Sequence, residues 1–201
     1  MMKRYFFTLL FALVAMATYA IDAKSVLDKV YAEYKKCPSI TAEFVIRVGE
    51  DEDEGTVLLQ GSKFRTQMSN HITWFDGKTM WSYAKDNEEV NVTEPTQTQL
   101  AKINPYAFLG IYKTGYDVAF GKNTKAYYEI VLTATSSKSS IKKAIIHVNR
   151  MNNHPTYVMM GQTKGNIEIR VTSFKKGKKQ ADSAFKFNKT KYPKADVIDL
   201  R

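Results

Sequence analysis

The residues that could do chemistry are few and widely spaced. Three histidines are present, His71, His147 and His154, and no two have the i, i+4 spacing of a zinc-binding helix. The Gly-Lys-Thr of residues 77–79 lacks the first glycine of a phosphate-binding loop and falls in a predicted hairpin turn. The sequence has no Gly-x-Ser-x-Gly motif and no carboxylate pair placed as general acid and base. We therefore predict no catalytic residue, no metal site and no cofactor, and a protein that is not an enzyme.

Large apolar side chains are abundant, with 12 Tyr, 11 Phe, 8 Met and 2 Trp. Around Trp74, Met80 and Tyr157 they occupy adjacent strand positions, so both faces of a strand are apolar. This pattern has two interpretations. Either the side chains fill a β core that helices cover, or they line a concave sheet that holds a flexible apolar ligand.

The first twenty residues have the organisation of a signal peptide. Lys3 and Arg4 precede an apolar run over residues 5–16 that is too short to span a bilayer, and small residues Thr18 and Ala20 precede a cleavage point. We predict a signal peptide at residues 1–20, with cleavage after Ala17 as the alternative. The mature chain, residues 21–201, is predicted to be a single domain in the periplasm.

The mature chain is predicted to have no membrane anchor and to be soluble. No cysteine stands at the cleavage point, and no later segment approaches about 20 apolar residues. Cys37 is the one cysteine of the sequence, so no internal disulfide forms and stability must come from a packed core.

Charge is distributed unevenly along the mature chain. Residues 21–100 carry 9 basic and 14 acidic groups, a net charge of −5, whereas residues 101–201 carry 19 and 6, a net charge of +13. The basic half favours an anionic partner, either phospholipid headgroups or an acidic protein surface, and not nucleic acid. A merely solvated basic surface is the alternative.

The hydrophobic period predicts one helix followed by many strands. Apolar residues from Val26 to Tyr34 recur at spacings of three and four, which predicts a helix that Asp22 or Ser25 caps and residues 37–38 stop. After that the period is two, and one or two short helices are predicted only over residues 96–112. Strands are predicted at residues 40–48, 56–60, 63–68, 72–75, 79–84, 90–93, 116–120, 126–134, 141–149, 156–162, 166–174, 184–187 and 196–198.

The connections between these strands predict the fold class. Asp76-Gly77, between two aromatic-rich runs, indicates a hairpin, and the acidic residues 50–55 indicate a solvated turn. The connections are too short for crossover helices, so the sheet is predicted to be antiparallel. About a dozen strands must curl or close, which predicts a barrel or half-barrel with a few helices against it.

One hairpin resembles a known family. Residues 74–83, Trp-Phe-Asp-Gly-Lys-Thr-Met-Trp-Ser-Tyr, and the later Glu-Val-Asn-Val of residues 89–92 are similar to the hairpin of LolA-type outer-membrane lipoprotein carriers. There an apolar strand runs into Ser-Asp-Gly-Lys-Thr-Leu-Trp. The leading helix, the Ile40-x-Ala42-x-Phe44 strand, Gly55 before the next strand, the segment around residues 105–109 and the closing residues 185–187 and 196–199 follow the family's order. The resemblance covers essentially the whole mature chain, and residues 76–81 are its most specific part.

The resemblance implies a mainly β fold: an open, unclosed antiparallel β-barrel of about 11 strands with a helical lid. It implies a monomeric periplasmic carrier that holds the acyl chains of lipoproteins in transit from the inner to the outer membrane. The implied partners are acylated lipoproteins, an inner-membrane lipoprotein-releasing transporter, a candidate outer-membrane receptor and transient membrane contact, without nucleic acid. The alternative is a lipid-binding or lipoprotein-sensing interaction protein of the same fold.

The sequence departs from the family at one position. Family members commonly carry Arg-Pro near the end of the strand that follows the glycine, where the Arg is thought to hold the lid through loop carbonyls. Gly61 stands at the Arg position, the Pro is absent, and Arg65 lies four residues later. The resemblance therefore does not carry the lid contact over to Arg65. Phe64 matches a cavity aromatic of the family best, and the candidate lipid-binding residues are Phe44, Ile46, Phe64, Met68, Trp74 and Met80.

Overall fold

The computed structural model describes residues 21–96, 99–100, 112–162 and 165–201. The predicted helix is confirmed as α1, Ala23–Lys36. Asp22 caps it, because the carboxylate oxygen Oδ1 accepts a hydrogen bond of 2.6 Å from the Ser25 N–H, one of the donors that a helix start leaves free. The predicted signal peptide lies outside the described residues. Within the described part of the chain, no helix is long and apolar enough to cross a membrane.

Twelve strands form one sheet. Its order is β12-β6-β5-β4-β3-β2-β1-β11-β10-β9-β8-β7, so β12 and β7 are the free edges and the sheet is not closed. The strands are β1 Ser39–Val48, β2 Asp51–Gln60, β3 Lys63–Met68, β4 His71–Phe75, β5 Met80–Ala84, β6 Glu89–Thr93, β7 Tyr116–Phe120, β8 Tyr127–Ala134, β9 Ile141–Asn149, β10 Pro155–Gln162, β11 Gly165–Gly177 and β12 Asp196–Asp199.

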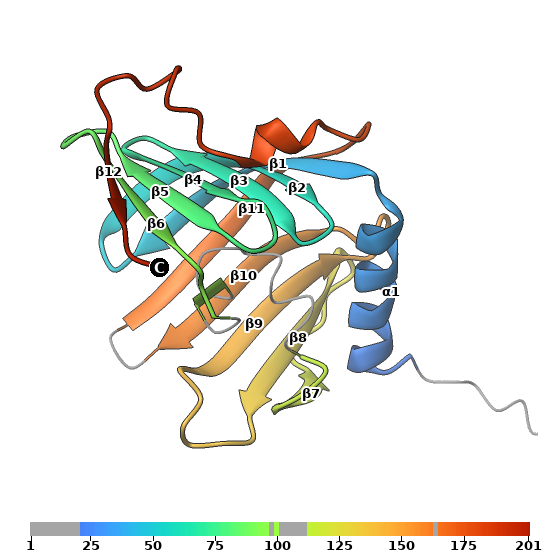
Figure 1. Ribbon diagram of the computed structural model, residues 1–201. Coiled ribbons are helices and arrows are strands. Elements are labelled where there is room, and N and C mark those ends of the chain that lie inside the picture. Colours follow the sequence, from blue (N-terminus) through green and yellow to red (C-terminus); the bar gives the residue numbers. More distant parts are fainter. Residues whose placement is uncertain (1–20, 97–98, 101–111, 163–164) are drawn as a thin grey trace, which may run out of the picture.

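The sheet has two wings that meet where β1 pairs with β11. The first wing holds β12 and β1–β6, the second holds β7–β11, and α1 lies across one end (Figure 1). The predicted mainly β, open architecture is confirmed. One pairing differs from the expectation of a wholly antiparallel sheet: β12 runs parallel to β6, because the C-terminal segment returns over the outside of the first wing before it pairs.

Three local predictions were wrong or untested. Residues 182–185 form a 3-10 helix, η1, instead of the predicted strand, because Asp182 pairs with Lys63 and Phe185 is fully buried. The acidic residues from Asp51 onward belong to β2, so the β1–β2 turn is shorter than predicted. Of the helices predicted at residues 96–112, Gln99 and Leu100 are helical, and most of the segment lies outside the described residues.

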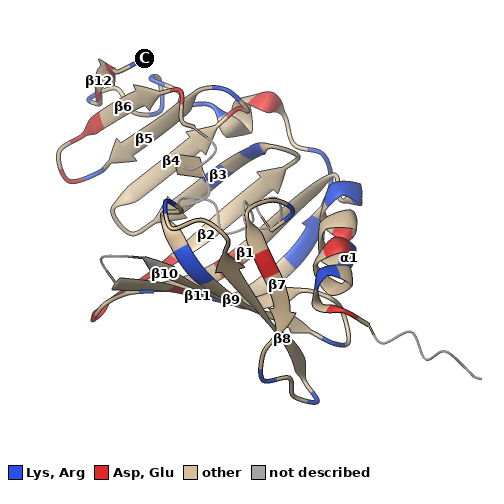
Figure 2. Ribbon diagram, turned by 90° about the horizontal axis from the view of Figure 1, so that it is seen from below, with Lys and Arg blue, Asp and Glu red and all other residues tan. Residues whose placement is uncertain are grey.

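The two faces of the sheet carry separate hydrophobic clusters. The face on which α1 packs, here the inner face, joins the helix to both wings. The opposite, outer face of β4–β6 carries a smaller cluster of Ile72, Trp74, Tyr83, Val90, Val92 and Ala195, against which Trp81, Phe187 and Tyr192 pack. The charged residues of α1, of both signs, are visible on the helix in Figure 2.

Candidate functional site

The inner face of the first wing is ordered in rows of side chains that lie opposite one another. The first, here the apolar row, crosses five strands through the pairs Ile40–Leu59, Leu59–Phe64, Phe64–Phe75 and Phe75–Met80. The ring centroids of Phe64 and Phe75 are 5.4 Å apart. Strand alternation places these residues on one face, so the wall is continuous and apolar.

Two residues further along each strand the wall becomes polar. Thr66, Thr73, Ser82 and Asn91 face one another in register across β3–β6 and form the polar row. Thr66 and Thr73 are buried, whereas Ser82 and Asn91 are partly exposed. The polar row continues an apolar stretch of β1 and β2, where Ala42 lies opposite Val57 and Val57 opposite Thr66.

Beyond the polar row, Gly55 separates two of the predicted lipid-binding residues. Gly55 lies opposite Phe44 on one side and Met68 on the other. A Cβ at Gly55 would lie 2.7 Å from Phe44 Cζ and 3.0 Å from Met68 Cγ, so the missing side chain leaves the space that these two occupy. This contact explains a glycine inside a strand, where it is otherwise unfavourable.

Five of the six predicted lipid-binding residues share the inner face. Phe44 and Phe64 are buried in the inner cluster with exposed fractions of 4% and 1%. Ile46, Met68 and Met80 are partly buried and pack against the same cluster. Phe64 is therefore reached only when the packing of the inner face changes, whereas Ile46, Met68 and Met80 are partly exposed in the present conformation.

Trp74 lies on the opposite face, which corrects the predicted grouping. Its rings pack edge-on against Phe187 and Tyr192, with centroids 5.7 and 5.6 Å away. The predicted facing of β4 was wrong by one residue. The strand is buried on both faces, so alternation of apolar and polar residues in its sequence does not distinguish them. Trp81, directly opposite Trp74, is the signal that could have revealed this second apolar face.

Two open spaces border the described residues of the first wing. A pocket of about 320 Å³ lies between Trp74, Arg65 and the segment that contains Lys186 and Lys191. An open groove of about 670 Å³ runs along β1–β3 and is lined largely by polar residues such as Glu43, Thr56 and Gln67, with Phe44 and Met68 beside them. Neither is an enclosed apolar cavity.

Tyr34 connects helix α1 to the first wing through a hydrogen bond. Its hydroxyl donates to the Gly61 carbonyl oxygen at 2.5 Å, in the turn between β2 and β3. Burial, and to a smaller extent the neighbouring Tyr31, raises the pKa of Tyr34 to about 12. The hydroxyl therefore stays protonated and remains a donor well above neutral pH.

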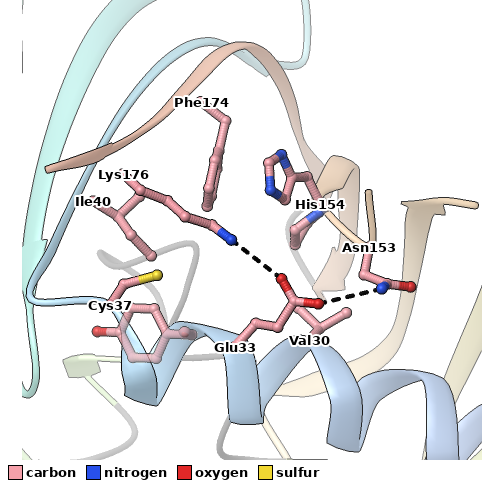
Figure 3. A pocket seen from close by; sticks show the side chains of 10 residues that line it. Val30, Glu33, Cys37, Ile40, Asn153, His154, Phe174 and Lys176 are labelled. Atoms are coloured by element: carbon pink, nitrogen blue, oxygen red, sulfur yellow. Dashed lines mark hydrogen bonds and ion pairs between the residues drawn. The ribbon is translucent and has the colours of Figure 1, made fainter. Parts of the chain in front are cut away.

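Glu33 connects the same helix to the second wing through an ion pair and a hydrogen bond. Its carboxylate accepts from Lys176 Nζ of β11 at 3.4 Å and from Asn153 Nδ2 of the β9–β10 turn at 3.3 Å, as Figure 3 shows. The adjoining pocket, lined by Cys37 and Phe174 among others, holds only about 10 Å³. Burial, with Lys176 adding to it, lowers the pKa of His154 there. The helix is thus closely packed at this end.

A third contact ties α1 to the segment before β7. The Tyr112 hydroxyl donates to Asp28 Oδ1 at 2.6 Å, and Tyr112 has an exposed fraction of 1%. The hydrogen bond lowers the pKa of Asp28, while burial and the same carboxylate raise the pKa of Tyr112. Lys113 Nζ lies 3.9 Å from the centroid of the Tyr31 ring.

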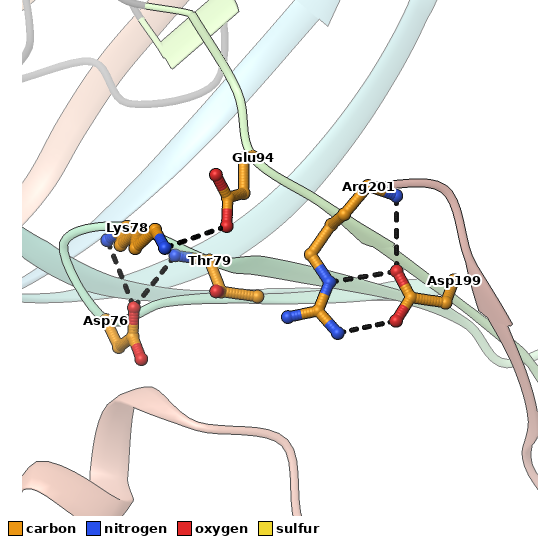
Figure 4. Close-up of polar contacts among 6 residues, drawn as sticks. All are labelled: Asp76, Lys78, Thr79, Glu94, Asp199 and Arg201. Carbon is orange, nitrogen blue, oxygen red and sulfur yellow. Dashed lines mark hydrogen bonds and ion pairs between the residues drawn. The ribbon is translucent and has the colours of Figure 1, made fainter.

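Residues 76–79, in the segment that resembles the family's hairpin, form the turn of a hairpin. The hairpin predicted at Asp76-Gly77 is confirmed between β4 and β5, and Asp76 accepts from the N–H groups of Lys78 and Thr79 at 3.1 and 2.9 Å (Figure 4). Partial burial opposes ionisation, yet the bonds from Thr79 and Lys78 and the charge of Lys186 lower the pKa of Asp76. Gly77 has φ of 104°, which favours glycine. Among the described residues, no cluster of three or more His, Cys, Asp or Glu could hold a metal ion.

Comparison with solved structures found several that are similar to this chain. A crystal structure of an uncharacterised conserved protein from Thermus thermophilus is 14% identical, with a TM-score of 0.61 over 88% of this chain and 98% of that one. A LolA superfamily protein from Nitrosomonas europaea is 13% identical over 84% of this chain and 99% of that one, with a TM-score of 0.46. The Mycobacterium tuberculosis lipoprotein LppX is 9% identical over 77% and 97%, with a TM-score of 0.46.

No curated protein matches the sequence. The family model described as outer membrane lipoprotein carrier protein LolA matches residues 13–164, which is most of the chain. The Thermus likeness supports the fold that this match implies. The chain therefore belongs to the LolA family of outer membrane lipoprotein carrier proteins.

Proposed function

We propose that this protein is a carrier of the bacterial envelope that shelters the acyl chains of lipoproteins on its inner face and moves them from the inner to the outer membrane. The observation that carries the proposal is the apolar cluster on the inner face, which contains Phe44 and Phe64 and against which Met68 packs, in an unclosed sheet of this family. In this proposal residues 1–20 are the signal peptide that directs a single domain, residues 21–201, to the periplasm.

The physical need for such a carrier follows from the cost of exposed hydrocarbon. Each CH₂ group removed from water contributes about 0.8 kcal/mol, so a lipoprotein does not cross an aqueous space unaided. A carrier must also release its cargo. Here the inner face buries Phe44 and Phe64 within its own cluster, so acyl chains compete with these internal contacts. The competition lowers the net affinity and allows release.

In this proposal the inner face opens by movement of α1. The wings are joined through β1 and β11, whose register shifts at Glu43/Phe44, and α1 is held to both wings by the Tyr34 and Glu33 contacts. Movement of α1 relative to the wings uncovers the inner cluster without breaking a strand pair. The proposed partners are acylated lipoproteins, an inner-membrane lipoprotein-releasing transporter, an outer-membrane receptor and transient contact with anionic membranes.

A transfer assay tests this function with neighbouring residues as a matched pair. Liposomes that hold a triacylated lipoprotein are mixed with the purified protein and sedimented, and soluble lipoprotein in complex with the carrier is measured. Met68→Glu places a charge on the inner face, and Gln67→Glu places the same charge on the outer face of the same strand. Wild type and Gln67→Glu should solubilise lipoprotein, whereas Met68→Glu should solubilise at least about tenfold less.

Circular dichroism checks that each variant is folded, and Met68→Gln replaces Met68→Glu if the charged variant unfolds. Folded wild-type protein that solubilises no lipoprotein contradicts the proposal. Equal activity of the folded Met68 variant and Gln67→Glu excludes the inner face as the binding surface.

A further inference from the structure

Two buried hydroxyl groups on the inner face lack a hydrogen-bond partner. Within the part of the chain that the structure describes, the buried side-chain polar atoms without a partner are Thr66 Oγ1 and Thr93 Oγ1. Both belong to the inner face of the first wing, since Thr66 lies opposite Val57 and Thr93 lies opposite Met80. An unpaired buried hydroxyl costs free energy, so one that a protein retains calls for a reason.

Thr66 lies in the middle of the proposed acyl-binding surface. Only 6% of its surface is exposed, and strand alternation places Phe64 and Met68 on either side of it on the same face. Valine has almost the same shape and would fill this position without an unpaired hydroxyl. Packing alone therefore does not account for threonine here.

The polar row continues from Thr66 through Thr73 to Ser82 and Asn91. It runs parallel to the apolar row of Phe64, Phe75 and Met80, two residues away along each strand, and becomes more exposed toward β6. On the inner face, the apolar row thus lies beside the polar row, whose side chains carry hydrogen-bonding groups. A molecule that matches both has a polar linkage at the head of a long apolar chain.

We propose that the polar row recognises the carbonyl group of an acyl linkage, with the Thr66 hydroxyl as the donor. An ester or amide carbonyl at the head of an acyl chain is a hydrogen-bond acceptor that plain hydrocarbon lacks. The tail lies along the apolar row, and the head group extends over Ser82 and Asn91 toward the edge of the wing. This inference rests on the proposed function, because the hydroxyl meets such a carbonyl only when an acyl chain enters the inner face.

Two lipids that differ in one carbonyl test the inference. The monopalmitoyl ester of glycerol and the hexadecyl ether of glycerol share a head group and a chain length, and the ether lacks the carbonyl. Their affinities are measured, below their critical micelle concentrations, by displacement of a bound fluorescent fatty acid. Wild-type protein should bind the ester about fivefold to tenfold more tightly than the ether, as one hydrogen bond predicts.

Thr66→Val should bind both lipids equally, and Thr66→Ser, which keeps the hydroxyl, should retain the preference for the ester. Thr56→Val removes an exposed hydroxyl from the outer face of β2 and should behave as wild type. Equal binding of ester and ether by wild type, or an undiminished preference in Thr66→Val, overturns the role of Thr66 and leaves the carrier function standing. If neither lipid displaces the probe from wild type, the carrier function fails and this inference with it.

Discussion

The Tyr34 hydroxyl donates a hydrogen bond to the carbonyl oxygen of Gly61. Gly61 stands where the family resemblance leads one to expect an arginine, and it adopts φ of 58°, a conformation that residues with a Cβ atom rarely adopt. At this position the structure has a hydrogen bond between α1 and the backbone of the turn. The helix supplies the side chain, and the turn between β2 and β3 supplies the backbone carbonyl.

Removal of the Tyr34 hydroxyl should loosen α1. Tyr34→Phe keeps the ring and loses the bond to Gly61, so we expect a loss of about 0.5–1.5 kcal/mol in the free energy of unfolding. Amide hydrogen exchange in α1 should accelerate more than exchange in β9. The control is Tyr31→Phe, which keeps the ring under Lys113. Unchanged exchange in Tyr34→Phe would show that the contact does not hold the helix.

The same tyrosine predicts a dependence of stability on alkaline pH. Its pKa in the folded protein is about 12 against an ordinary value of 10, so folding favours the protonated phenol. The stabilisation is fully present below pH 10 and is lost as the pH rises from 10 toward 12. The difference in unfolding free energy between wild type and Tyr34→Phe should therefore shrink over this range in denaturant titrations. A difference that stays constant to pH 12 contradicts the assigned pKa.

Gly55 is predicted to be intolerant of a side chain. Its Cβ would meet Phe44 Cζ at 2.7 Å and the backbone oxygen of Gln67 at 3.0 Å, and the backbone cannot easily move away. Gly55→Ala should cost about 1–3 kcal/mol, as overpacking of a core does. Gly161→Ala is the matched control in a strand, because its nearest contact is an ordinary 3.4 Å. Similar melting temperatures for the two variants would contradict the close packing of Phe44 over Gly55.

Thr66 is predicted to lower the stability of the ligand-free protein. Thr66→Val removes an unpaired buried hydroxyl with little change of shape, so the free energy of unfolding should rise by about 1–2 kcal/mol. Val57→Thr places a hydroxyl at the neighbouring buried position and should lower it by a similar amount. Urea titrations compare the three proteins. A destabilised Thr66→Val would mean that the hydroxyl has a structural partner.

Local sequence signals were sufficient for much of the fold. The alternation of β9 and the cap at Asp22 follow from neighbours in the chain, and both were confirmed. The pairing of β12 with β6 and the helical turn that ends at Phe185 depend on contacts with distant residues such as Lys63. Periodicity contains no information about such contacts, so the sequence alone could not predict them.

The residue types of the candidate site could be predicted from the sequence, whereas the face on which each residue lies could be predicted only in part. Phe64 and Met68 alternate with polar neighbours in one strand, so the face that these two share could be read from the sequence. Trp74 lies in a strand that is apolar on both sides, where alternation does not distinguish inside from outside. The contact between Tyr34 and Gly61 joins a helix to a turn, and the unpaired state of Thr66 depends on packing from several strands. Only the folded chain reveals them.

The most direct test of the central claim is to map where an acyl chain lies on the protein. A palmitoyl lipid with a diazirine along its chain is bound to the purified protein, irradiated, and located by mass spectrometry of peptides. We predict labelling of inner-face residues in the strands of Ile46, Met68 and Met80, and loss of labelling when unlabelled lipoprotein competes. Labelling that centres on the outer cluster of Trp74, Trp81 and Tyr192, or no saturable labelling, would contradict the claim that the inner face receives the acyl chain.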